Sequence, residues 1–167
     1  MPRMTFAADS RIASAAVDGA KRFAEQARKN QGVDLDYSDD SVERVETLAD
    51  VYTRGRSDRN DATAEQDRLI AIANDMGAYV GECLRRNHGG RWGMVKDEES
   101  GDRFPGLETA TRALIWPTGR ARTRLLRGAE DNIWHYYLFT LDAEAKKAGS
   151  KAPEMRGGWR RLFRRDG

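Results

Sequence analysis

The sequence predicts a helix-rich α+β domain, with four or more helices and a small antiparallel sheet of two or three strands in its second half. Apolar residues recur at steps of three and four through most of the first 86 residues, which is the period of amphipathic helices. Beyond Gly90 the pattern changes to short apolar runs separated by charged turns and prolines. The 167 residues fit one domain, which we expect over 1–148, followed by a basic tail at 149–167.

The first half predicts three helices, which we expect over residues 8–30, 40–52 and 63–86. Gly32 is typical of a residue that ends the first helix, and Ser38 or Asp39 is a candidate N-cap of the second. A charged loop at 54–62 precedes the third helix.

Small residues stand four apart in the third helix, at Ala73, Gly77 and Gly81. Each internal glycine costs about 1 kcal/mol relative to alanine in a helix. Such a row indicates a place where another backbone packs very closely against this helix.

The second half predicts the sheet and two further helices. Short strands are expected at 91–95, 103–104 and 111–116, the second ended by Pro105 and the third by Pro117. Helices are expected at about 118–127 and 130–147, the first of them ended by Gly128.

Charge is divided unevenly along a chain whose net charge is only +2. Residues 1–102 hold 15 Lys and Arg against 20 Asp and Glu, a sum of −5, whereas residues 103–167 hold 14 against 7, a sum of +7. The basic half is suited to an anionic partner or to pairing with the acidic half of the same chain.

Composition and missing motifs exclude several classes of protein. The single cysteine, Cys83, excludes an intramolecular disulfide and a cysteine-rich zinc site, and its place on an apolar helix face indicates a buried thiol. No run is long enough to span a membrane, and no secretory signal precedes the first helix. Phosphate-binding loops, dinucleotide fingerprints and nucleophile elbows are absent. We therefore expect a cytoplasmic protein without a metal or other cofactor.

Several short motifs occur together: LDYS at 35–38, GAYVGE at 77–82, GGRW at 89–92, IWP at 115–117 and RGAED at 127–131. As a set, spread over about residues 30–141, they resemble a family of small bacterial proteins of unknown function. The resemblance implies a single bacterial intracellular domain, and it implies no substrate or catalytic residue.

Four side chains are candidates for chemistry, namely Glu82, His88, Asp131 and His135. Glu82 is a candidate general base beside the small-residue row, or else an ion-pair partner of the arginines three and four residues on. Asp131 stands four residues before His135, a helical step that lets a carboxylate orient an imidazole. For both histidines the alternative is a structural role, at a helix C-terminus or in a hydrogen bond.

The expected helix at 118–127 carries a basic face formed by Arg120, Arg124 and Arg127. Such a face can bind phosphate or a carboxylate-rich partner. An equally weighted alternative is internal pairing with the acidic second helix.

The tail carries apolar residues on one helical face and arginines on the others, which is typical of a segment that contacts an anionic membrane, a nucleic acid or a partner's groove. Its candidate binding residues are Trp159, Arg160, Arg161, Leu162, Phe163, Arg164 and Arg165.

These observations favour a non-enzymatic protein-binding or regulatory module. The alternative is a binder of nucleic acid or an anionic membrane surface through 120–127 and 159–165. A third hypothesis is a small hydrolase that uses Glu82 and His135, and it requires the candidate catalytic groups to meet in one pocket.

Overall fold

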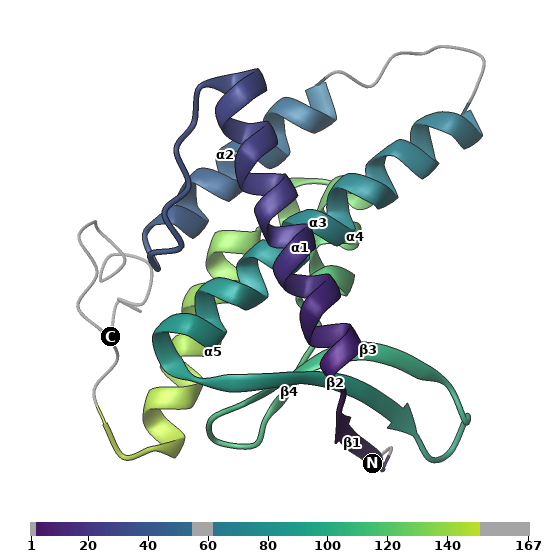
Figure 1. Cartoon of the computed structure of the whole chain (residues 1–167), viewed down its shortest axis with the longest axis vertical. Coiled ribbons are helices and arrows are strands. Elements are labelled where there is room, and N and C mark those ends of the chain that lie inside the picture. Colours follow the sequence, from purple (N-terminus) through teal and green to yellow (C-terminus); the bar gives the residue numbers. More distant parts are fainter. Residues whose placement is uncertain (1–2, 55–61, 151–167) are drawn as a thin grey trace, which may run out of the picture.

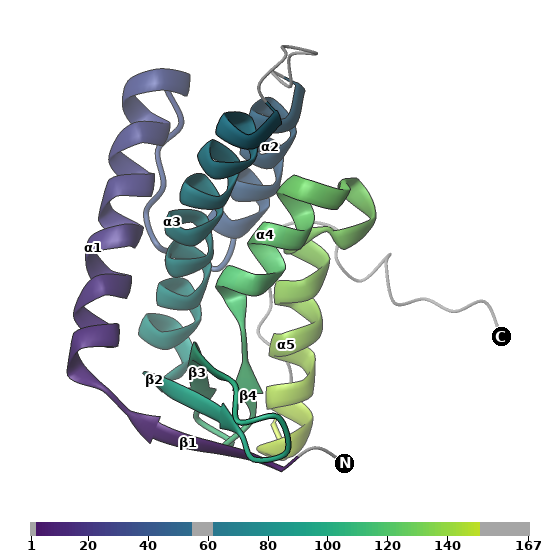
Figure 2. The ribbon, with the colours of Figure 1, turned by 90° about the vertical axis from the view of Figure 1, so that its right-hand side faces the viewer.

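A computed structural model of the chain describes residues 3–54 and 62–150, so most of the basic tail and the charged loop lie outside the described residues. Five α-helices and one four-stranded antiparallel sheet make up the described part, which confirms the predicted fold class. The helices stand above one face of the sheet, which lies at their lower end in both ribbon views (Figures 1 and 2).

The elements follow one another as β1 (Met4–Ala8), α1 (Ser10–Gln26), a π-helical turn η1 (Ala27–Gln31), α2 (Ser41–Arg54), α3 (Ala62–His88), β2 (Gly90–Asp97), β3 (Arg103–Thr109), β4 (Leu114–Ile115), α4 (Pro117–Arg127), a 3-10 turn η2 (Ala129–Asp131) and α5 (Ile133–Lys147). The predicted helices all form. Side-chain caps set two of their starts, because Asp9 accepts hydrogen bonds from the first turn of α1 and Asn132 accepts one from the first turn of α5.

The sheet has the strand order β1-β2-β3-β4 and contains one strand that the sequence pattern did not predict. That strand is β1, which pairs with β2 from Met4 opposite Asp97 to Ala8 opposite Gly93. Its five residues are too few to show a clear period, and its partner lies about 90 residues away in the sequence. The sequence of β1 alone therefore could not indicate a strand whose pairing is decided by tertiary structure.

The expectation that Pro105 ends the second predicted strand was wrong. Strand β3 continues through Pro105 to Thr109. Proline is tolerated there because β4 pairs only with Leu107 and Glu108, so one side of β3 faces no strand at residue 105.

The row of small residues in α3 marks a close approach of another backbone, as predicted, and also of an aromatic side chain. A Cβ atom at Gly77 would lie 2.3 Å from the Cα atom of Thr118, and one at Gly81 would lie 2.3 Å from the ring of Trp92. The start of α4 and the indole of β2 therefore reach the backbone of α3 only because these positions carry no side chain.

Helix α4 is held against α2 by a buried arginine that pairs with two carboxylates. Arg124 is 1% exposed, and its guanidinium donates to Glu46 Oε1 at 2.7 Å and to Asp50 Oδ1 at 2.6 Å. The other oxygen of Glu46 accepts a hydrogen bond from the backbone N–H of Ile133 at 2.7 Å, so the same carboxylate also holds the start of α5.

Candidate functional site

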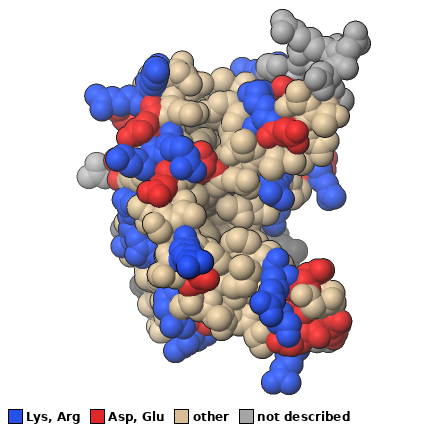
Figure 3. Space-filling model, turned by 45° about the vertical axis from the view of Figure 1, so that its right-hand side comes forward, with Lys and Arg blue, Asp and Glu red and all other residues tan. Residues whose placement is uncertain are grey.

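Helices α1 and α4 stand on either side of α3 (Figure 2). A groove lies between them, lined by residues of both helices. Its volume is about 960 Å³, at the upper end of the range of roughly 300–1,000 Å³ that is usual for ligand pockets. In Figure 3 surface without charged side chains runs down the middle of the molecule, between groups of blue and red side chains. A second, smaller hollow of about 360 Å³ lies beside His135 and Phe139.

The end of the groove next to the sheet is aromatic. Trp116 and Phe104 lie with ring centroids 5.6 Å apart, and Met4 and Pro105 of the sheet line the same end. The indole N–H of Trp116 is buried and has no hydrogen-bond partner among the described residues. Buried donors are nearly always satisfied in proteins, so this N–H is an exception within the described part of the chain.

The walls of the groove are formed by small residues. Helix α1 contributes Ala15, Ala16 and Gly19, and α4 contributes Gly119. Because these side chains project little, an occupant can approach the helix backbones closely.

The opposite end of the groove is cationic. Arg22 of α1 donates to both oxygens of Asp75, at 2.9 and 3.1 Å, while Arg122 of α4 donates to Oδ1 of the neighbouring Asn74 at 3.2 Å. Hydrogen bonding to Asp75 raises the pKa of Arg22. The partner of Arg122 is an uncharged amide, and no carboxylate of residues 3–54 or 62–150 forms an ion pair with Arg122.

A third arginine of the groove is already occupied. Arg120 forms an ion pair with Asp131 at 3.1 Å, and its guanidinium lies 4.9 Å from the centroid of the Tyr136 ring. Burial raises the pKa of Tyr136 to about 12, so its hydroxyl stays protonated at neutral pH.

Glu82 lies outside this groove, in a buried ion-pair cluster. Its carboxylate is 0% exposed and accepts hydrogen bonds from Arg85 at 2.7 and 2.9 Å, from Arg86 at 3.0 Å and from the indole N–H of Trp92 at 2.9 Å. Burial raises the pKa of Glu82, but these hydrogen bonds outweigh it and hold the pKa below its ordinary value. The structural alternative for Glu82 is therefore the one that the geometry supports.

His88 forms part of a second polar network, centred on Asp39. The Asp39 carboxylate binds His88 Nε2 at 2.8 Å and accepts from the Tyr137 hydroxyl at 2.5 Å and from Asn87 Nδ2 at 3.3 Å. Burial raises the pKa of Asp39, yet the bonds from His88 and Tyr137 bring it below its ordinary value. The network joins the segment before α2 to the ends of α3 and α5.

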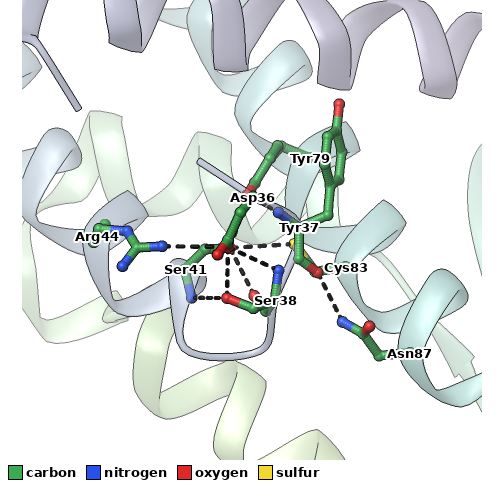
Figure 4. Close-up of polar contacts among 8 residues, drawn as sticks. All are labelled: Asp36, Tyr37, Ser38, Ser41, Arg44, Tyr79, Cys83 and Asn87. Carbon is green, nitrogen blue, oxygen red and sulfur yellow. Dashed lines mark hydrogen bonds and ion pairs between the residues drawn. The ribbon is translucent and has the colours of Figure 1, made fainter. Parts of the chain in front are cut away.

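The LDYS motif forms the turn beside this network (Figure 4). Asp36 accepts hydrogen bonds from the N–H and hydroxyl of Ser38 at 3.1 and 2.6 Å, and the Ser38 hydroxyl accepts from the N–H of Ser41 at 3.2 Å. Ser38 is thus the residue that caps the start of α2, one of the two predicted. Ser41 in turn bonds the Tyr79 hydroxyl at 2.7 Å, which also accepts from the N–H of Tyr37.

Cys83 is buried next to this turn, with its sulfur 3.8 Å from the Ser41 hydroxyl. Burial raises the pKa of the thiol to about 12. The thiolate, which is the nucleophilic form, is therefore scarce at neutral pH.

Asp131 and His135 do not form the helical pair that their spacing predicted. Asp131 belongs to the η2 turn and pairs with Arg120, while α5 begins after it at Ile133. His135 is exposed and lines a smaller hollow of about 360 Å³ beside Phe139, away from Glu82 and His88. The four candidate catalytic residues therefore share neither of the two hollows.

The predicted basic face of α4 divides in the structure. Arg124 is buried against the acidic second helix, Arg120 pairs with Asp131, and Arg127 is exposed without an ion pair to any residue of the described ranges. Internal pairing, one of the two interpretations of this face, thus accounts for Arg124. The tail residues Trp159, Arg160, Arg161, Leu162, Phe163, Arg164 and Arg165 lie outside the described residues.

In the ranges 3–54 and 62–150, no three His, Cys, Asp or Glu side chains gather in a geometry that could hold a metal ion. None of the helices in these ranges has the length and apolar character needed to cross a membrane.

The residues that build the groove were not identified from the sequence pattern as one site. Arg22 of α1, Phe104 of β3, Trp116 between β4 and α4, and Arg122 of α4 come from separate parts of the chain, and only tertiary packing brings them together. The row at Gly77 and Gly81 was the available signal, because the close approach of α4 and Trp92 to α3 forms the inner part of the groove.

Comparison with known proteins adds a fold relationship. No protein-family model matches the chain, and no curated protein matches it. The chain is similar to a crystal structure from Bacteroides thetaiotaomicron VPI-5482, with a TM-score of 0.60 and 16% sequence identity. The match covers 86% of this chain and 49% of the other, so this chain spans about half the length of that protein. At this identity the similarity shows a shared fold alone.

Proposed function

We propose that this chain is a non-enzymatic protein-binding module whose partner binds in the groove between α1 and α4. The observation that carries the proposal is the groove itself, which leaves the aromatic pair Trp116 and Phe104 partly exposed in the free molecule. Partly exposed apolar surface in a hollow is typical of a binding site. Internal bonds engage the side chains of Glu82, His88 and Asp131, which supports binding over hydrolysis.

Binding of a nucleic acid or an anionic membrane through 120–127 and 159–165 receives less support. Two of the three arginines proposed on α4 already neutralise carboxylates of the same chain, and phosphate binding would have to displace them. The contribution of the tail stays a prediction. We propose that the module acts in the bacterial cytoplasm, in keeping with the composition of the chain.

Site-specific photocrosslinking in cells that make the protein tests the proposal. A benzophenone amino acid is placed at Ala15, on the groove wall, or at Ser14, which is exposed on the same helix outside the groove. We expect a discrete protein adduct from position 15, identified by mass spectrometry, and none from position 14. Adducts of equal yield from both positions, or none from either, would contradict a partner in this groove.

A further inference from the structure

We infer that the groove recognises a segment of the partner protein in which apolar side chains stand next to Asp or Glu. The inference rests on the function proposed above and specifies the chemistry of the occupant. It follows from the different character of the two ends of the groove, which calls for an occupant that is apolar at one end and anionic at the other.

The apolar end provides the affinity. Trp116 and Phe104 form a tilted aromatic pair that remains partly exposed, and Ile12 of α1 is also only partly covered. Covering apolar surface gains about 25 cal/mol per Å², and aromatic anchors dominate many protein interfaces. An aliphatic or aromatic side chain of the partner fits against this end.

The cationic end selects the charge. Three arginines line the groove, but Arg22 pairs with Asp75 and Arg120 with Asp131. Arg122 is the one that forms no ion pair with any residue of the described ranges. Arg122 is exposed, and its Nε–H donates a hydrogen bond to the neutral amide of Asn74. A guanidinium forms its strongest hydrogen bonds with a carboxylate, which it holds through two parallel N–H groups. An Asp or Glu of the partner therefore offers Arg122 a better acceptor than the one it has.

The same charges argue against an occupant from this chain's own tail. Residues 159–165 contain four arginines and no acidic residue. Because Arg22 and Arg120 are already neutralised by Asp75 and Asp131, a basic segment would meet the positive charge of Arg122 without a compensating carboxylate. The excess of positive charge favours an acidic segment from another protein.

The shape of the groove favours a polypeptide over a small molecule. Pockets for small molecules usually enclose about 70–90% of the ligand surface, whereas this groove lies open on the face of the molecule (Figure 3). The low walls at Ala15 and Gly119 allow a peptide backbone to lie along the groove, as in recognition of a helix in a groove.

Selection from a displayed peptide library on the full chain tests the inference. Peptides that still bind the variant Ala15→Phe, in which a ring fills the groove, are removed, and the enriched peptides are measured against Arg122→Glu. Ser14→Phe and Arg127→Glu are the matched controls, since each makes the same change at an exposed site on the same helix outside the groove. Circular dichroism shows whether each variant folds as the wild type does.

We expect the enriched peptides to combine apolar residues with Asp or Glu. Arg122→Glu should weaken their binding about tenfold, and the two control variants should bind within about twofold of the wild type. Replacing the acidic residues of the peptide by lysine should restore binding to Arg122→Glu. The indole N–H resonance of Trp116 should shift when the peptide binds.

Other outcomes overturn the inference and separate it from the proposed function. Enrichment of neutral or basic peptides, or equal binding to Arg122→Glu, would refute the charge selection while leaving a protein partner in the groove. Binding of dodecanoate with the same variant dependence, and no peptide enriched, would assign the groove to a small amphiphile. An absence of both peptides and a crosslink from position 15 would refute the inference and the proposed function together.

Discussion

Replacing Gly77 by alanine should destabilise this protein, although alanine is the better helix former. The new Cβ atom would lie 2.3 Å from Cα of Thr118, 2.6 Å from its N atom and 2.7 Å from the carbonyl oxygen of Pro117. All three are backbone atoms at the start of α4, so no side-chain rotation relieves the contact. Relief requires α4 to move away from α3 by about 1 Å, since ordinary contact begins at 3.4 Å.

The magnitude follows from two opposing effects. Alanine gains about 1 kcal/mol over glycine inside a helix, while overpacking a well-packed core costs about 1–3 kcal/mol. The upper end applies here, because α4 also carries the buried Arg124 and Leu125. We expect a net loss of about 1–2 kcal/mol in the free energy of unfolding. With an m-value of roughly 1–3 kcal/mol/M, the urea midpoint should fall by about 0.3–2 M.

Urea unfolding followed by circular dichroism measures this loss. Gly119→Ala is the matched control, because a Cβ atom there would meet nothing closer than the Cβ atom of Trp116, at 3.6 Å. The control should match the wild type or gain up to about 1 kcal/mol. If Gly77→Ala were as stable as the wild type at an unchanged m-value, the close packing of α4 on α3 would not be a rigid constraint.

Three further predictions concern the buried polar groups. Arg124→Met should lower the free energy of unfolding by about 2–4 kcal/mol in urea titrations, since it strands two acidic partners beside the core. The bonds from His88 and Tyr137 lower the pKa of Asp39 in the folded state, so their stabilisation is present above the ordinary carboxyl pKa of 3.8 and lost as pH falls through the folded value. Asp39→Asn should therefore reduce the dependence of stability on pH in acid. Cys83 is buried, with a pKa of about 12, so a thiol reagent at pH 8 should label it only as fast as the protein unfolds.

Each of these predictions has a result that would contradict it. Arg127→Met, at an exposed position of the same helix, should change the free energy of unfolding by less than about 0.5 kcal/mol. If it lost as much stability as Arg124→Met, burial of Arg124 would not explain the loss. An Asp39→Asn protein with the acid dependence of the wild type would show that other carboxylates dominate it. Rapid labelling of Cys83 under native conditions would show local opening near Ser41.

The helices were predictable because each carries its own period and end signals. Gly32 adopts φ 66° at the end of η1, as the local sequence indicated, and Pro117 is the first residue of α4, one residue earlier than the expected start. Strand β1 and the continuation of β3 through Pro105 were not predictable in this way. Both depend on which side of a strand is paired, and that is decided by residues far away in the chain.

In the candidate site, too, contacts within one helix were predictable and contacts between separate elements were not. An ion pair between Glu82 and the arginines that follow it could be weighed from spacing, because helical neighbours three and four residues apart meet. The contact between Asp39 and His88, and the meeting of Trp116 with Phe104, could not be. Each joins separate elements whose relative positions no local pattern encodes.

The pairing of β1 with β2 has a consequence for how the chain is made. Synthesis runs from the N-terminus, so Met4 waits until Asp97 has been added before its partner exists. At roughly 5–20 residues per second, that interval is about 5–20 seconds. During most of this interval α1 also has no α3 to pack against, because Ala78, which contacts Gly19, belongs to α3. Strand β1 and helix α1 are thus synthesised well before the elements that they pair with and pack against, and they stay without these partners for most of the interval.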